Sequence, residues 1–99
     1  MPPTIDWRGV FAILLTPFDE DGSLREAWLA TQVDFCVRAG VRGVVTPGIA
    51  SEVSTLSDAE RGRLVEHAVE AAGGRVPVVA GVSSASAVQA GLLARSAAA

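Results

Sequence analysis

The residues best suited to bind a ligand lie between positions 43 and 61. A short apolar run there ends at Pro47, and a polar loop, Gly48–Leu56, follows. Ser57 then opens a capping-box pattern with Glu60, which predicts the start of a helix. The stretch therefore predicts a strand, a loop and a helix. Ligands of parallel α/β folds bind at the carboxyl ends of strands, because strand ends and helix N-termini converge there, so this loop is the predicted binding loop.

Other side chains with chemical potential have ordinary structural explanations. A serine cluster after the third apolar run is typical of a helix N-cap, since no Gly-x-Ser-x-Gly elbow makes a nucleophile there. The single histidine lies between two glutamates on a helix and lacks the partners of a metal site. An acidic turn before a glycine is typical of a loop. We predict no catalytic role, no metal and no cofactor for these residues, which are Ser83, Ser84, Ser86, His67, Asp19, Glu20 and Asp21.

The charged residues exclude several classes of partner. Eight basic and 11 acidic residues give a net charge of −3 without a basic cluster. We therefore predict no nucleic-acid partner and no membrane partner, because both need a basic face. The amino-terminal residues lack the blocks of a signal peptide, so a cytoplasmic protein is expected. All eight basic residues are arginine; the chain has no lysine, the residue that forms Schiff bases.

Three apolar runs predict three strands, at residues 10–16, 43–47 and 75–81. The first is continuous, which is typical of a parallel strand buried on both faces. A helix is predicted after each run. The first follows a capping-box pattern formed by Ser23 and Glu26, the second covers about residues 57–72, and an Ala-rich third continues to the chain end.

This alternation predicts an α/β fold with a parallel sheet and right-handed crossovers. Val44 follows Phe11 by 33 residues, and Pro77 follows Val44 by 33, so the chain holds three similar βα units in one domain, residues 1–99. A barrel of eight such units takes about 250 residues. The last helix has no closing cap, glycine or proline, and we expect an incomplete piece of a larger fold.

Several segments carry a family resemblance through their order and spacing. They are Gly9–Phe18, Asp21-Gly22, Gly48-x-x-x-Glu52, Leu56–Arg61 and Arg75–Gly81. Together they resemble the dihydrodipicolinate synthase / N-acetylneuraminate lyase family over essentially the whole chain. The resemblance implies the amino-terminal part of a (β/α)8 TIM barrel, its first three βα units, in a class I aldolase-type lyase that is a homo-oligomer at full length.

Such a lyase condenses pyruvate or a related 2-oxo acid with an aldehyde, or cleaves the product. In the family the 2-oxo acid forms a Schiff base with a lysine on a later strand, and a tyrosine from another later strand moves protons. This chain has neither residue. No catalytic residue is therefore expected within it, because only a primary amine can turn a 2-oxo acid into an iminium at neutral pH.

The predicted binding loop departs from the family pattern. The usual Gly-Thr/Ser-Thr-Gly-Glu has hydroxyl side chains that contact the substrate carboxylate and join a proton relay, whereas this chain has Gly48-Ile49-Ala50-Ser51-Glu52. Main-chain N–H groups at Ile49 and Ala50 still suit a carboxylate, since such donors do not depend on the side chain. The hydroxyl group of Ser51 or Thr46 could take the place of the missing hydroxyl groups in the proton relay. A reaction other than dihydrodipicolinate synthesis is expected.

Two further residues gain expected roles from the resemblance. Thr16 matches the Thr-Pro pair of the family and is expected to face the substrate pocket, although a threonine there also suits a turn. Glu52 matches a loop-anchoring carboxylate that fastens main-chain donors. The predicted substrate-binding residues are thus Thr16, Gly48, Ile49, Ala50 and Ser51.

Two alternatives remain open at this stage. One is a non-catalytic αβ fragment or interaction module that holds an open sheet edge against a partner protein. The other is a nucleotide-binding doubly wound domain, which is disfavoured because no Gly-x-Gly-x-x-Gly follows the first strand.

Overall fold

The computed structural model describes residues 5–98. Residues 1–4 and 99 of the expected domain lie outside this part. Strands and helices alternate as predicted, with two short 3-10 helices in the loop after the second strand. The elements are β1 Phe11–Ile13, α1 Glu26–Ala39, β2 Gly43–Thr46, η1 Ile49–Ser51, η2 Val53–Thr55, α2 Asp58–Ala72, β3 Val78–Ala80 and α3 Ala87–Ala98.

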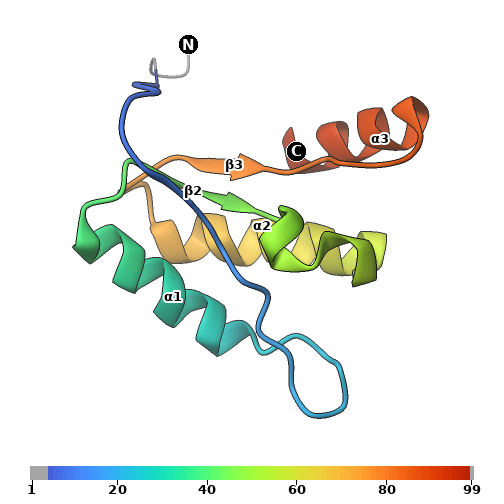
Figure 1. The fold of residues 1–99 in the computed structure, drawn as a ribbon, viewed down its shortest axis with the longest axis horizontal. Helices are drawn as coiled ribbons and strands as arrows, with labels where there is room; N and C mark the ends of the chain where they lie inside the picture. The colour runs from blue at the N-terminus through green and yellow to red at the C-terminus, as the bar shows by residue number, and fades with distance from the viewer. Residues whose placement is uncertain (1–4, 99) are drawn as a thin grey trace.

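The three strands form one parallel sheet in the order β1-β2-β3. Val44 of the central strand pairs with Ala12 on one side and Val78 on the other. Helices α1 and α2 lie side by side along the sheet, and α3 follows β3 (Figure 1). The core lies between these two helices and the sheet and consists of Leu14, Leu29, Val33, Val44, Leu64, Ala68 and Ala72.

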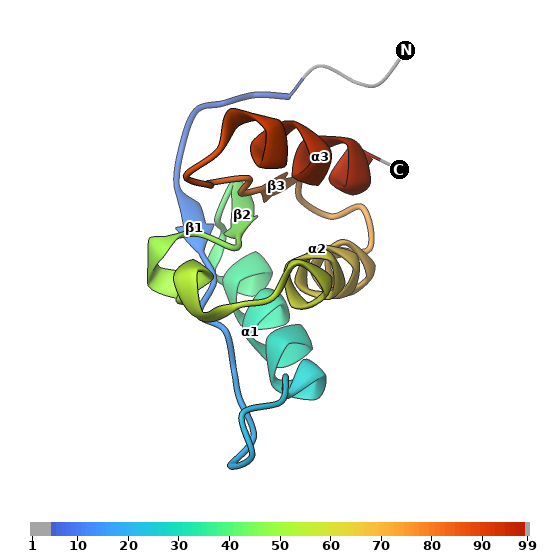
Figure 2. The ribbon, with the colours of Figure 1, turned by 90° about the vertical axis from the view of Figure 1, so that its right-hand side faces the viewer.

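The prediction that the first apolar run is buried on both faces is wrong. Leu14 is fully buried, but Ile13 is 51% exposed and Leu15 is 61% exposed. Successive side chains of a strand point to opposite faces, and α1 and α2 cover only the face that carries Leu14 (Figure 2). The run is apolar on both sides because its second face also suits an apolar neighbour, which the described residues do not supply.

One predicted capping box is confirmed and the other is wrong. Ser57 Oγ accepts from the Glu60 N–H at 3.1 Å, and Glu60 Oε1 accepts from the Ser57 N–H at 2.9 Å. Helix α1 instead begins after Arg25, which makes no side-chain cap. The Ser23 hydroxyl donates to Asp21 Oδ1 at 2.6 Å and helps lower the pKa of that carboxyl. Leu24 forms an isolated bridge with Phe18, and the helix begins only at Glu26, so Ser23 lies two residues before the N-cap position.

Large apolar side chains are exposed on the outer side of α1. Trp28 is 62% exposed and Phe35 is 66% exposed, while Leu92 of α3 is 58% exposed. No helix in residues 5–98 has both the length and the apolar character needed to cross a bilayer. Exposed apolar side chains grouped on one side of a helix are typical of a surface that contacts another protein segment.

We expect the 99-residue chain by itself to be weakly stable and to associate. Two sheet edges and an apolar face are uncovered in the described structure, and such surfaces pair with other chains. Size-exclusion chromatography with urea unfolding tests this, and Phe35→Gln should reduce the associated fraction because Phe35 is 66% exposed. A monodisperse monomer with a steep, cooperative urea transition would contradict the prediction.

Candidate functional site

The predicted binding loop lies at the carboxyl end of β2, and its first residues form η1. The Ile49 side chain is 91% exposed, and Ala50 is exposed beside it. Ser51 is fully buried, and Gly48 is half-buried. Thr16, which follows β1, is buried against the same loop. The fold thus brings all five predicted substrate-binding residues to one end of the sheet.

Ser51 ties the loop to the end of β1. Its hydroxyl donates to the carbonyl oxygen of Leu14 and accepts the N–H of Gly48 at 3.0 Å. The Thr16 hydroxyl donates to the Ser51 carbonyl oxygen at 2.5 Å. These hydrogen bonds attach the loop to the segment that follows β1. Ser51 and Thr16 therefore position the loop, since their hydroxyl groups are already bound to main-chain atoms.

Within the described residues, the main-chain N–H groups of Ile49 and Ala50 at the start of η1, like those of Val53 and Ser54 in η2, donate to no acceptor. The two amides that follow Ala50 are used internally: Ser51 N–H donates to Gly48 O and Glu52 N–H to Ile49 O, each at 3.0 Å. Two adjacent donors in the first turn of a helical segment suit an anionic oxygen, most simply one carboxylate.

The hydroxyl groups left as substitutes for a proton relay are both buried. Thr46 is 1% exposed, and Ser51 is fully buried with its proton directed at Leu14. Within residues 5–98, neither of these two hydroxyl groups lies at the exposed surface of η1.

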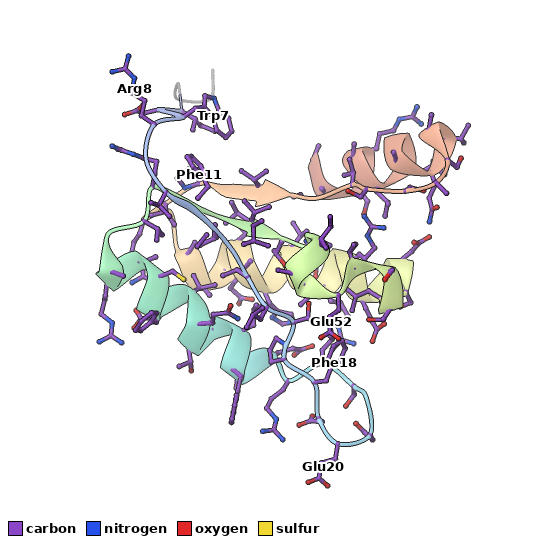
Figure 3. The ribbon with its side chains drawn as sticks, viewed as in Figure 1. Trp7, Arg8, Phe11, Phe18, Glu20 and Glu52 are labelled. Atoms are coloured by element: carbon purple, nitrogen blue, oxygen red, sulfur yellow. The ribbon has the colours of Figure 1, made fainter. Side chains whose placement is uncertain are left out.

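Glu52 shapes the loop through its main chain. It adopts the left-handed region with φ 60° and ψ 42°, which is uncommon for a residue other than glycine. Its carbonyl oxygen accepts from the N–H and the hydroxyl of Thr55, at 2.9 and 2.8 Å. Its side chain is exposed at the end of the molecule near Phe18, opposite the stacked Trp7 and Phe11 (Figure 3). The anchoring role of its carboxylate stays a prediction.

Arg61 belongs to this end of the sheet and was missed by the sequence interpretation. Its side chain is buried, and Nη2 donates to the carbonyl oxygen of Gly81, after β3, at 3.3 Å. Gly81 N–H donates to Thr46 O at 3.1 Å, so α2, β3 and β2 are linked. The signal was its spacing, because Arg61 precedes Leu64 and Ala68 on the buried stripe of α2.

The remaining candidates have structural partners. The Ser86 hydroxyl accepts the Gln89 N–H at 3.3 Å at the start of α3, which confirms the predicted N-cap role of the serine cluster. His67 Nε2 lies 3.2 Å from Glu26 Oε1 of α1, and Asp19 pairs with Arg25 at 2.5 Å. Within residues 5–98, no three metal-ligating side chains gather at one point.

A family comparison agrees with this arrangement. Residues 6–99 match the model of the dihydrodipicolinate synthetase family. The chain belongs to this family. The resemblance read from the sequence is therefore confirmed, and the α/β fold with a parallel sheet is the one that solved members of the dihydrodipicolinate synthetase family share with it.

Relatives of known name are lyases that are considerably longer. An uncharacterized DapA-like lyase of Rhizobium meliloti is 46% identical over 79 residues, which make up 80% of this chain and 26% of the relative. Dihydrodipicolinate synthase from Acinetobacter baumannii, solved in complex with pyruvate, matches at TM-score 0.89 and 28% identity. N-acetylneuraminate lyase from Mycoplasma synoviae matches at TM-score 0.85 and 30% identity.

These two solved structures match 96% and 93% of this chain, respectively, but the chain covers only 32% of each. The chain thus spans from about a quarter to about a third of the length of these relatives.

Proposed function

We propose that residues 1–99 form the first three βα units of a (β/α)8 barrel, which acts as a Schiff-base lyase on pyruvate or a related 2-oxo acid and an aldehyde. One observation carries the proposal: the main-chain N–H groups of Ile49 and Ala50, at the start of η1 and the carboxyl end of β2, donate to no acceptor within the described residues. Family membership supports it, as does the pyruvate bound to the Acinetobacter baumannii relative.

In this proposal the chain binds and orients the substrate and makes no covalent bond to it. Two N–H donors bind the carboxylate. The hydrogen bonds of Thr16 and Ser51 fix the position of the loop that carries these donors. The 2-oxo group must become an iminium to accept electrons, and that step needs a primary amine from a lysine. This chain contains no lysine and no tyrosine, so the covalent and proton-shuttle steps belong to other parts of the barrel.

The loop favours a reaction other than 4-hydroxy-tetrahydrodipicolinate synthesis. Ile49 and Ala50 carry no hydroxyl groups, and the nearest alternatives, Thr46 and Ser51, are buried. The names of several relatives point to the synthase, but those names describe longer proteins. Carboxylate binding through main-chain donors survives the change of side chains, whereas a proton relay through hydroxyl groups does not. We therefore assign this chain to a related lyase with a different aldehyde or a different proton path.

A hybrid barrel tests the proposal. In it, residues 6–98 of this chain replace the matching amino-terminal segment of the Acinetobacter baumannii synthase, and the host supplies the remaining strands. We expect pyruvate with borohydride to leave a reduced adduct, which peptide mass spectrometry places outside the replaced segment, because arginine stays protonated and forms no imine. The 99-residue chain alone should show at most modification of its α-amino group.

The unmodified host enzyme is the control for adduct formation. With the aldehyde substrate of that synthase, the hybrid barrel should turn over far more slowly than the host while still forming the pyruvate adduct. A stable adduct on a side chain within residues 6–98 would overturn the assignment. Synthase turnover equal to that of the host would show that the altered loop does not change the reaction.

A second candidate function is a non-catalytic interaction module. The exposed apolar side chains beside the open edge of β1, with Trp28 62% exposed and Phe35 66% exposed, favour this reading. A hybrid barrel that folds but forms no pyruvate adduct would support the module and contradict the lyase.

A further inference from the structure

Gln32 of α1 binds the main chain just beyond the end of β1. Its Oε1 accepts the Leu15 N–H at 2.8 Å, and its Nε2 donates to the Leu15 carbonyl oxygen at 2.9 Å. One side-chain amide thus occupies both main-chain groups of a single residue, as a residue of an antiparallel neighbouring strand would. Within residues 5–98, no other group binds the Leu15 main chain.

Leu15 lies between the two residues that hold the binding loop. Before it, the Leu14 carbonyl oxygen accepts the Ser51 hydroxyl; after it, the Thr16 hydroxyl donates to the Ser51 carbonyl oxygen at 2.5 Å. The Ser51 hydroxyl also accepts the Gly48 N–H at 3.0 Å. A continuous series of contacts therefore runs from Gln32 to the start of η1.

The ladder of the sheet does not hold this segment. The last strand pairing of β1 is at Ile13, and the Leu14 N–H still donates to Val45 O at 2.9 Å. Beyond Leu14 the chain leaves the sheet, and Gln32 supplies the next main-chain contacts. The placement of Thr16 thus depends on a side chain of α1 as well as on β2, which holds Leu14, and on the Arg25 N–H, which donates to Pro17 O at 2.9 Å.

We propose that Gln32 is a positioning residue for the carboxylate-binding amides of Ile49 and Ala50. Gln32 fixes the main chain of Leu15. Leu14 and Thr16 can then keep their hydrogen bonds to Ser51, which hold η1 in its binding geometry. This inference rests on the proposed function for its effect on substrate, but the coupling between Gln32 and the loop is a property of the fold itself.

The substrate arm of the test uses Gln32→Met in the hybrid barrel, because methionine has a similar length and no hydrogen-bonding amide. We expect KM for pyruvate to rise about tenfold with kcat changed by less than about threefold, since two hydrogen bonds that position the loop are lost. Gln32→Glu keeps the acceptor and loses the donor, and should fall between Gln32→Met and the parent.

Thr31→Val is the matched control. Thr31 neighbours Gln32 on α1, and its hydroxyl bonds only within the helix, to Ala27 O at 3.1 Å. It should leave KM unchanged. With Ser51→Ala already present, Gln32→Met should change KM by less than about twofold, because Ser51→Ala has already removed the hydroxyl that joins Leu14 to the loop. Additive effects, or a loss of stability with KM unchanged, would overturn the inference.

The fold arm uses amide hydrogen exchange on the hybrid barrel without pyruvate. In Gln32→Met, the amides of Leu15 and Gly48 should both exchange about tenfold faster, with Thr31→Val unaffected. If the parent hybrid binds no pyruvate while Gly48 exchange still follows Gln32, the proposed function fails and the positioning role stands. If Gln32→Met leaves the amide exchange rate of Gly48 unchanged, the positioning role is refuted, whether or not the hybrid barrel binds pyruvate.

Discussion

Ala50→Pro is expected to abolish most of the pyruvate affinity of the hybrid barrel. Proline removes one of the two proposed N–H donors, and it biases Ile49 towards an extended conformation, whereas Ile49 begins the 3-10 helix η1. A hydrogen bond to a charged group contributes about 1.5–3 kcal/mol, so each donor that is lost should weaken binding roughly ten- to a hundredfold. Titration calorimetry with pyruvate measures the change.

Ile49→Thr and Ala50→Thr are the matched controls, because they keep both N–H groups and restore the hydroxyl side chains. Each added hydroxyl should change affinity by about 0.5–1.5 kcal/mol at most. The double variant should gain turnover with the aldehyde substrate of the synthase without a large change in pyruvate affinity. If Ala50→Pro binds pyruvate as tightly as the parent, the loop is not the carboxylate site and only connects β2 to α2.

Gly81→Ala is expected to be the most destabilising single substitution in the sheet. A Cβ at this position would lie 1.8 Å from the carbonyl oxygen of Pro47 and 3.0 Å from its carbonyl carbon. Both are main-chain atoms, so β3 and β2 must separate at their carboxyl ends. We expect a loss of about 3 kcal/mol or more, at the top of the range for an overpacked core and a large share of the stability of a domain.

Gly62→Ala is the same chemical change, but we expect it to increase the stability of the protein. Gly62 lies inside α2, and a Cβ there would meet no atom within 4 Å. Alanine should stabilise the helix by about 0.5–1 kcal/mol relative to glycine. Urea midpoints of the hybrid barrel and its two variants decide the matter. A Gly81→Ala midpoint equal to that of the parent would mean that the contact with Pro47 is not required.

These expectations share one structural cause. Hydrogen bonds of Ser51 and Thr16 attach the loop to the segment after β1, while Arg61 binds Gly81, which in turn binds the Thr46 carbonyl oxygen next to Pro47. None of these contacts involves the side chains of Ile49 and Ala50. The loop can therefore change its outward side chains and keep its shape, which is how a carboxylate site can persist while the rest of the chemistry changes.

Local hydrogen bonding was predictable from the sequence where the partners are a few residues apart. The Ser57–Glu60 capping box joins groups three residues apart, and both bonds form as predicted. The Ser23–Glu26 pattern failed because Leu24 bridges Phe18 and the helix begins only at Glu26, which leaves Ser23 before the N-cap position. Patterns of this range are reliable only when contacts with other segments let the helix begin where they predict.

The composition of the chain and the order of its apolar runs also determined two features of the protein. A chain without lysine cannot form the Schiff base on a side chain, and three apolar runs at intervals of 33 residues specify parallel strands with helices between them. Neither conclusion depends on the exact placement of any atom.

The tertiary structure alone decided which groups at the end of the sheet are available to a ligand. Thr16 reaches Ser51 across 35 positions of sequence, Ser51 reaches Leu14 across 37, and Gln32 reaches Leu15 across 17. These partners meet only when the strands pair and α1 packs on the sheet. The sequence could name the hydroxyl groups of the loop, but their burial, and the exposure of residues Ile49 and Ala50, follow from contacts between segments that are distant along the chain.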